Sequence, residues 1–233
     1  MSEYRDRDHI KSYVKRATRL SDHQRRSYEA LSGRYCVRRC DSPIDPSSLF
    51  DHPERPVVLE IGFGMGHATA EIAAATPGVN YLGVEVYKPG VGKLLSRIHE
   101  ATLGNVRIIH DDAILVLDRM IPDDSISGIH LFFPDPWPKK RHQKRRIVRP
   151  ALTQLMARRL RCDGYLYMVT DWLEYAVAAK EVLDRTEGLR NRYDGFAPPQ
   201  PWRPQTAFER KGRRAERPIL ELYYVRPSYS SAS

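Results

Sequence analysis

Apolar runs alternate with amphipathic segments along most of the chain. The run 57–66 (VVLEIGFGMG) opens as a continuous apolar strand before it breaks into glycines, a pattern typical of a central parallel strand buried on both faces. Further strands are expected over 81–87, 106–113, 127–135, 164–172 and 219–225. Helical spacing of apolar residues predicts helices over 67–76, 88–103, 114–120, 150–161 and 172–185. This alternation indicates an α/β fold with a doubly wound, mostly parallel sheet, whose ligands bind at the carboxyl ends of the strands.

The two ends of the chain do not fit this alternation. The apolar residues over 10–17 suggest a single helical turn set among arginines. We therefore expect a basic N-terminal arm over 1–40, one domain over 41–227 and a disordered tail over 228–233. A chain of 233 residues has room for one α/β core but would be cramped as two.

Composition limits the class of protein. With 41% apolar residues the chain can form a hydrophobic core, which excludes a wholly disordered polymer or a collagen-like fibre. No apolar run approaches the roughly 18 residues that span a bilayer, and the opening residues lack a secretory signal, so we expect a cytoplasmic protein without a membrane partner. Cys36, Cys40 and Cys162 form no CxxC pair and the histidines are scattered, so neither a disulfide framework nor a metal site is expected. Monomer and homodimer both stay open.

The formal net charge of +9 is distributed unevenly. Residues 1–39, 134–161 and 190–217 carry net charges of +6, +9 and +5, whereas 40–133 carry −7 and 162–189 carry −4. Basic segments outside an acidic core are expected where several parts of a chain converge on a polyanion, and nucleic acid is the leading candidate. Solvated charged faces and an anionic membrane are the alternatives.

Glycines at the end of the first strand indicate a ligand-binding turn. Gly62, Gly64 and Gly66 form GxGxG, which lets the backbone turn tightly and approach a ligand without Cβ clashes. A dinucleotide-binding GxGxxG would have its third small residue one position later, where His67 stands. The spacing therefore favours S-adenosylmethionine, which brings no phosphate to the turn. Glu85, at the end of the next strand, is placed to grip two ribose hydroxyls, a role that suits either cofactor.

Two further carboxylates lie at the same strand ends. Glu60 is inside the apolar run, where an ionised carboxylate needs donors: either loop amides and the ammonium of a bound methionine moiety, or a structural salt bridge. Asp112 can accept a hydrogen bond from the adenine amino group or cap the helix that follows. Both pairs of alternatives stay open at the level of the residues.

The segment 133–146 (FPDPWPKKRHQKRR) is the strongest candidate for a reaction centre. Its three prolines fix φ at alternate positions and favour extended conformations for the residues before them, so we expect a stiff loop. Asp135 is interpreted as a carboxylate held beside the cofactor, with a turn aspartate as the alternative. Trp137 can stack on a base, and the cations that follow, beginning with Lys139, suit phosphates.

Two later motifs allow both a structural and a functional interpretation. Asp171 and Glu174 have the spacing of an N-terminal capping box for the helix 172–185. Thr206 and Glu209 share that spacing but precede RKGRR rather than an apolar helix face, which favours a substrate loop. In such a loop, Glu209 can accept hydrogen bonds from N1–H and the exocyclic amine of guanine.

A set of motifs covers most of the chain: KSYVKRATRLSDHQ, VVLEIGFGMG, GVEVY, DDA, LFFPDPWPKKRHQKRR, TDW, TAFE and the final strand. Together these motifs resemble those of bacterial single-subunit tRNA (guanine-N7)-methyltransferases. The resemblance implies a Rossmann-like, seven-stranded class I methyltransferase domain that moves a methyl group from S-adenosylmethionine to N7 of a guanosine in the variable region of tRNA. It implies cofactor contacts from Glu60, Glu85, Asp112 and Asp135, with Asp135 catalytic. It also implies substrate contacts at Lys139, Asp171, Thr206, Ala207, Phe208 and Glu209, and RNA contacts from Arg141, His142, Gln143, Lys144, Arg145 and Arg146.

Three other functions stay open at this stage. The DPW motif also resembles the acidic, proline-containing loops of amino-methylating enzymes, which would act on adenine N6. The GxGxG motif with Glu85 is compatible with an NAD-dependent oxidoreductase. A non-enzymatic RNA-binding protein would explain the basic segments but would leave Glu60, Glu85 and the glycines without a purpose.

Overall fold

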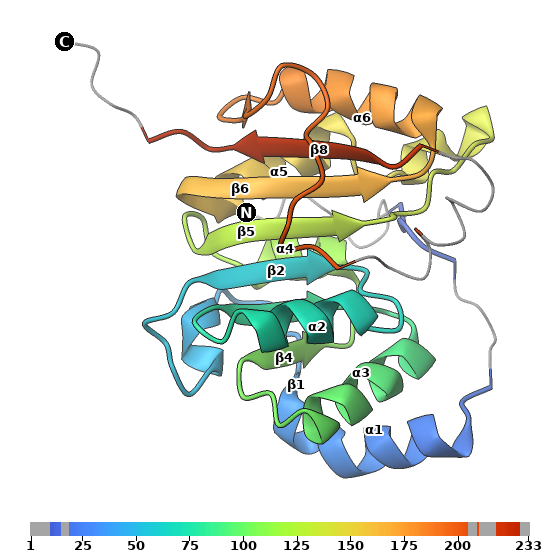
Figure 1. Cartoon of the computed structure of the whole chain (residues 1–233), viewed down its shortest axis with the longest axis vertical. Coiled ribbons are helices and arrows are strands. Elements are labelled where there is room, and N and C mark those ends of the chain that lie inside the picture. Colours follow the sequence, from blue (N-terminus) through green and yellow to red (C-terminus); the bar gives the residue numbers. More distant parts are fainter. Residues whose placement is uncertain (1–9, 15–18, 205–208, 210–217, 229–233) are drawn as a thin grey trace.

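The computed structural model describes residues 10–14, 19–204, 209 and 218–228. These residues form one eight-stranded sheet in the order β1-β4-β3-β2-β5-β6-β8-β7, with helices on both faces (Figure 1). The strands are β1 (Cys36–Val37), β2 (Val57–Ile61), β3 (Asn80–Val84), β4 (Val106–Ile109), β5 (Ile126–Phe132), β6 (Leu160–Thr170), β7 (Arg190–Asn191) and β8 (Leu220–Val225). The predicted doubly wound α/β class is confirmed.

Neighbouring strands from β1 to β6 pair in parallel, and β8 lies antiparallel between β6 and β7. The chain passes outward from β2 through β3 to β4 and later returns to place β5 on the other side of β2. This reversal creates a topological switch point at the carboxyl ends of β2 and β5. Six of the eight strands were predicted from apolar runs, and the two-residue strands β1 and β7 extend the edges of the sheet without an apolar run to signal them. The sheet therefore has one strand more than the seven that the family resemblance implied.

Helices cover the sheet in two layers, each with its own core (Figure 1). Residues of α1, α2 and α3 pack on one face, and residues of α4, α5 and α6 pack on the other. The helices are α1 (Asp22–Tyr35), α2 (His67–Ala75), α3 (Lys88–Glu100), α4 (Ala113–Arg119), α5 (Pro150–Arg159) and α6 (Leu173–Asp184), with 3₁₀ helices η1 (Pro46–Leu49) and η2 (Lys140–Arg145). Each predicted helix is present with ends within a few residues.

Part of the segment expected to be an arm is built into the fold. Helix α1 begins with a capping box in which Ser21 and Gln24 bond each other's backbone N–H. It lies along α3, where a Cβ on Gly92 would come 2.5 Å from the carbonyl oxygen of Gln24, so this close approach requires glycine. Residues 10–14 are not helical, so the turn suggested there does not form in them, while 15–18 and 229–233 lie outside the described residues.

Three predicted strands end earlier than their apolar patterns suggested. The strands expected over 81–87, 106–113 and 127–135 stop at Val84, Ile109 and Phe132. The residues after each end leave the ladder and supply side chains to the carboxyl edge of the sheet. No described helix is long and apolar enough to cross a membrane, and the described residues contain no cluster of metal-ligating side chains.

Candidate active site

Carboxylates gather where four strand ends meet the switch point. The glycine turn follows β2, Glu85 follows β3, Asp112 lies beyond β4, and the proline-rich segment follows β5. Parallel strands present their carboxyl ends at one edge, so these side chains share a region. Glu85 interacts electrostatically with both Glu60 and Asp135, which places these three acids together. The structure therefore assembles most of the predicted cofactor residues at one site.

Glu60 is a buried acid with one oxygen left without a hydrogen-bond donor among the described residues. It lies in β2 between Gly83 of β3 and His130 of β5, and it is 2% exposed. Its Oε2 has no hydrogen-bond partner, and no basic side chain pairs with it, within the described part of the chain. Burial raises its pKa to about 7; the neighbouring Thr69 hydroxyl opposes this rise, and the charge of Glu85 adds to it. A buried acceptor left unsatisfied is costly, which favours a ligand as its partner over the structural salt bridge.

The glycine turn wraps around Glu85. Gly62, Gly64 and Gly66 have φ of +76°, +57° and +66°, in the left-handed region that glycine adopts without strain. The Glu85 carboxylate accepts backbone N–H groups of Gly64, Val86 and Tyr87 at 2.9, 2.7 and 2.9 Å. Because a carboxylate offers about four acceptor sites, these three bonds fix its position and leave room for a ligand hydroxyl.

Asp112 is both a helix cap and a neighbour of the N-terminal segment. Its Oδ1 accepts the N–H of Ile114 at 3.0 Å, so the capping interpretation is confirmed. The phenol of Tyr13 also hydrogen-bonds the Asp112 side chain, and burial, with Asp112 and Asp111 beside it, raises the pKa of Tyr13 to about 12. Tyr13 therefore remains a protonated donor at neutral pH. The adenine contact of Asp112 stays a prediction.

The proline-rich loop does not have the backbone conformation expected of it. Phe133 and Trp137 precede prolines and were predicted to be extended, but their φ values are +49° and +45°. Phe133 donates its N–H to Val169 at 2.8 Å, and Trp137 donates Nε1–H to the carbonyl of Ser12 at 3.3 Å. Left-handed bulky residues cost about 1–3 kcal/mol each and persist where surrounding contacts over-determine them. Tertiary contacts thus override the local preference before proline.

Asp135 is an exposed residue of this loop, and a buried arginine binds the backbone of the loop. Arg146 donates Nε–H to the carbonyl of Pro136 at 2.8 Å, and its guanidinium lies 4.8 Å from the ring centre of Tyr175. Arg146 was predicted to touch RNA; it is 7% exposed and its Nε–H is bonded to the loop, while its buried Nη2 has no hydrogen-bond partner among the described residues, so the RNA contact stays a prediction. Lys139 is exposed and lies directly before η2.

Other predicted RNA-contacting residues lie in η2 and face solvent or the N-terminal segment. Arg141, Gln143 and Lys144 are exposed, and His142 packs edge-on against Trp137. Arg145 stacks over Trp137 at 4.5 Å and donates to the carbonyls of Lys11 and Tyr13 at 3.1 and 3.2 Å. The proline-rich loop is therefore joined to residues far away in the sequence.

The remaining predicted substrate residues are Asp171 and the segment 206–209, and they differ in their surroundings. Helix α6 is capped by Trp172 without a side-chain bond, so the capping box expected of Asp171 is absent and Asp171 follows the end of β6. Glu209 is 1% exposed and pairs with Arg203 at 2.7 Å. Arg203 also pairs with Glu221 at 2.6 Å, so Glu209 is held by a buried ion pair. Thr206, Ala207 and Phe208 lie outside the described residues.

Sequence reasoning missed the contacts of Tyr13 and Arg203, and also that of Arg39, whose Nε donates to Oδ2 of Asp111 at 3.1 Å. None was singled out, because each acts on a carboxylate that is distant in the sequence or that belongs to another element. The KSYVKR motif included Tyr13, but no spacing rule links it to Asp112.

Comparison with known proteins identifies the family of this chain. A model of the family described as "Putative methyltransferase" matches residues 54–222. A tRNA (guanine-N(7)-)-methyltransferase of Bordetella pertussis is 47% identical over 218 residues, covering 94% of this chain and 85% of its own. A second, from Treponema pallidum, is 41% identical over 242 residues, covering 93% and 96%.

The chain belongs to the tRNA (guanine-N7)-methyltransferase family. Solved structures agree with the fold of this family at the level of architecture. The 16S rRNA methyltransferase KamB superposes with a TM-score of 0.55 at 14% identity, covering 92% of this chain and 97% of its own. An rRNA methylase from Streptococcus thermophilus gives a TM-score of 0.50 at 14% identity, covering 78% and 92%. These two methyltransferases therefore share the overall fold of this chain.

The residues at the switch point fit the methyl donor of the family. Within the described part of the chain, a Cβ at Gly62 or Gly64 would meet nothing within 4 Å, so the turn leaves open space there, and Glu60 offers a buried oxygen that lacks a donor. Glu85 is fixed by three backbone bonds at the neighbouring strand end. S-adenosylmethionine presents an ammonium group, ribose hydroxyls and an adenine amino group, which are donors of the kind that carboxylates can accept.

Proposed function

We propose that this protein transfers a methyl group from S-adenosylmethionine to N7 of a guanosine in the variable region of tRNA, giving 7-methylguanosine. The observation that carries this proposal is the unpartnered, buried Oε2 of Glu60 beneath the glycine turn, in a chain whose relatives are tRNA (guanine-N7)-methyltransferases. The same observation argues against a non-enzymatic RNA-binding protein, which would have no use for it. A tRNA substrate is consistent with action in the cytoplasm.

The cofactor contacts of the proposal fall on four carboxylates. Glu60 accepts from the ammonium group, Glu85 from a ribose hydroxyl and Asp112 from the adenine amino group, with Asp135 at the open side of the site. When bound, S-adenosylmethionine supplies an electrophilic methyl group on a sulfonium. The three backbone donors on Glu85 and the helix cap on Asp112 hold these side chains before any ligand arrives.

Methylation of guanine N7 requires no proton transfer by the protein before the methyl group moves. Guanine N7 carries a lone pair and no proton, so a general base is not required, and positioning dominates the rate. Positive charge develops on the imidazole part of the base, and the Asp135 carboxylate offers a fixed negative charge at the loop tip to stabilise it or to orient the base. Arg146 keeps that loop in place through Pro136.

The substrate side of the proposal uses the exposed basic residues of the loop and η2. Lys139, Arg141 and Lys144 are exposed and suited to phosphates. Asp171 and the segment 206–209 are proposed to contact the substrate. Because Glu209 is already paired with Arg203, we propose that it contributes by holding its segment on β8 as well as by any contact with the base.

Incubation of the protein with labelled S-adenosylmethionine and unmodified tRNA, followed by nucleoside analysis, tests this function. We expect label in 7-methylguanosine. Label in N6-methyladenosine would instead support the amino-methylating alternative. Binding of NAD without binding of S-adenosylmethionine in calorimetry would support the oxidoreductase, and either result would overturn the proposal.

A further inference from the structure

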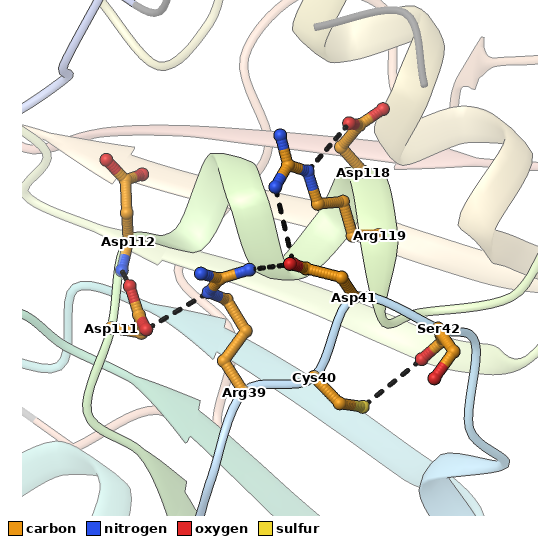
Figure 2. Close-up of polar contacts among 8 residues, drawn as sticks. All are labelled: Arg39, Cys40, Asp41, Ser42, Asp111, Asp112, Asp118 and Arg119. Carbon is orange, nitrogen blue, oxygen red and sulfur yellow. Dashed lines mark hydrogen bonds and ion pairs between the residues drawn. The ribbon is translucent and has the colours of Figure 1, made fainter. Parts of the chain in front are cut away.

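Arg39, which follows β1, contacts Asp41 in its own segment and Asp111 beyond β4 (Figure 2). Its Nε donates to Oδ2 of Asp111 at 3.1 Å, and its Nη1 donates to Oδ1 of Asp41. Arg119, at the end of α4, reaches the same oxygen of Asp41 at 3.3 Å. The two arginines share Asp41, but of these two it is Arg39 that contacts Asp111.

Asp111 transmits this contact to the proposed cofactor site. Its Oδ1 accepts the backbone N–H of Asp112 at 2.7 Å, while its Oδ2 accepts from Arg39. Asp112 is 4% exposed and is further fixed by its cap on α4. A single carboxylate, using both oxygens, therefore joins Arg39 to the backbone of Asp112.

We propose that Arg39 is a positioning residue for cofactor binding, acting through Asp111 to set the placement of Asp112. This inference rests on the proposed function, in which the Asp112 carboxylate accepts the adenine amino group. Arg39 belongs to the segment whose positive charge pointed to RNA, but its guanidinium is shared between two carboxylates. Its contacts therefore connect it to the proposed cofactor site rather than to RNA.

Charge supports the same assignment. Asp111 and Asp112 are consecutive acids, and two neighbouring carboxylates repel each other when both are ionised. The guanidinium of Arg39 attracts the Asp111 carboxylate and offsets its charge. Figure 2 shows the Asp112 carboxylate pointing away from the Asp111–Arg39 pair. The pair therefore does not compete for the Asp112 carboxylate, which accepts from Ile114 and Tyr13 and, with about four acceptor sites, has capacity left for a ligand.

The contribution of the pair to global stability is expected to be small. The side chains of Arg39 and Asp111 are 22% and 37% exposed, and partly exposed ion pairs add little to the free energy of unfolding. A change at Arg39 should therefore alter cofactor affinity much more than the thermal midpoint, which separates positioning from a purely structural role.

Arg39→Gln tests the inference when binding of S-adenosylmethionine is measured by calorimetry and binding of unmodified tRNA is measured separately. We expect the Kd for S-adenosylmethionine to rise about five- to tenfold, as for loss of one charge-assisted hydrogen bond. The Kd for tRNA should change by less than about twofold, as expected of a residue without phosphate contacts. Arg39→Lys keeps the charge without the planar fork and should give an intermediate Kd.

Arg119→Gln is the matched control, because it removes the other arginine on Asp41 and leaves the Asp111 contact intact. Its Kd for S-adenosylmethionine should equal that of the wild type. In an Asp111→Asn background, which keeps an acceptor for the Asp112 N–H, Arg39→Gln should cause no further loss.

Three results would overturn the inference: unchanged cofactor affinity in Arg39→Gln, an equal loss in Arg119→Gln, or a loss confined to tRNA binding. If the wild-type protein itself does not bind S-adenosylmethionine, the proposed function fails instead, so the two failures are distinguishable.

Discussion

At the scale of single residues, burial of carboxylates at the site lowers the stability of the folded protein. Glu60 is buried without a donor on one oxygen, and burial raises the pKa of Glu85 as well. A fold selected for stability alone would gain by replacing Glu60 with an apolar residue of similar volume. Retention of an acid in the middle of β2 is therefore best explained by a ligand that neutralises it.

This cost predicts a pH dependence of stability that Glu60→Gln removes. The pKa of Glu60 is raised from 4.5 to about 7, so as pH rises through this window the unfolded chain loses its proton first and the free energy of unfolding falls. The shift corresponds to roughly 3 kcal/mol at full effect. Above pH 7, Glu60→Gln should be more stable than the wild type while binding S-adenosylmethionine more weakly.

Urea unfolding of both proteins between pH 4.5 and 8 measures this difference directly. The free energy of unfolding of the wild type relative to Glu60→Gln should decline between about pH 4.5 and pH 7 and level off above that range. A difference that stays constant over the window would show that the carboxyl group titrates normally in the folded chain.

Asp135→Ala should leave the fold intact and remove most methyl transfer. The residue lies exposed at the loop tip, so its truncation creates no cavity and should leave the thermal midpoint near that of the wild type. Loss of a fixed charge aimed at a developing charge typically lowers turnover about 100- to 1,000-fold. Single-turnover assays with saturating tRNA provide the measurement, and near-normal turnover would contradict the assignment of Asp135.

Residues of this kind differ in how far sequence alone predicts them. Glu60 and Glu85 could be predicted, because an acid in or directly after an apolar run is conspicuous. Asp112 was left between two roles, of which the cap on α4 is confirmed. Tyr13 and Arg203 could not be predicted, because their partners are fixed by tertiary packing that carries no local pattern.

At the scale of elements, α1 shows how a charge-rich composition can hide a helix. The segment 21–35 contains several arginines and little apolar periodicity, which led to the expectation of an arm. Ser21 and Gln24 nonetheless form a capping box, and their spacing is visible in the sequence. Packing on α3 through Gly92 then stabilises a helix that would be marginal in isolation.

Ser21→Ala should lower the free energy of unfolding by about 1 kcal/mol, the usual cost of losing an N-cap. The Ser21 hydroxyl accepts the N–H of Gln24 at 3.3 Å, and alanine cannot replace it. Ser27→Ala on the same helix is the control, because Ser27 only donates to the His23 carbonyl and caps nothing. Chemical denaturation of the three proteins tests this, and equal losses in both variants would mean that the cap itself contributes nothing.

At the scale of the whole molecule, the basic segments differ in function although they look alike in sequence. In the central segment, Arg146 is buried under the loop and Arg145 binds backbone carbonyls of the N-terminal segment. In the first segment, Arg39 is occupied by carboxylates. Net charge therefore predicted a polyanionic partner but could not separate cations that face it from cations that hold the protein together.

Salt dependence of tRNA binding can make this separation. Each phosphate neutralised by the protein contributes about −0.7 to −0.9 to the slope of log K against log salt concentration. Lys144 is exposed in η2, so Lys144→Gln should make the slope less steep by about this amount. Arg146→Gln removes the same formal charge from a buried position, so it should leave the slope unchanged while slowing turnover through a loosened loop.

Filter binding over a salt series measures both slopes. Equal changes in the two variants would mean that burial does not decide which cations meet RNA, and a wild-type slope near zero would remove the basic loop from the interface altogether.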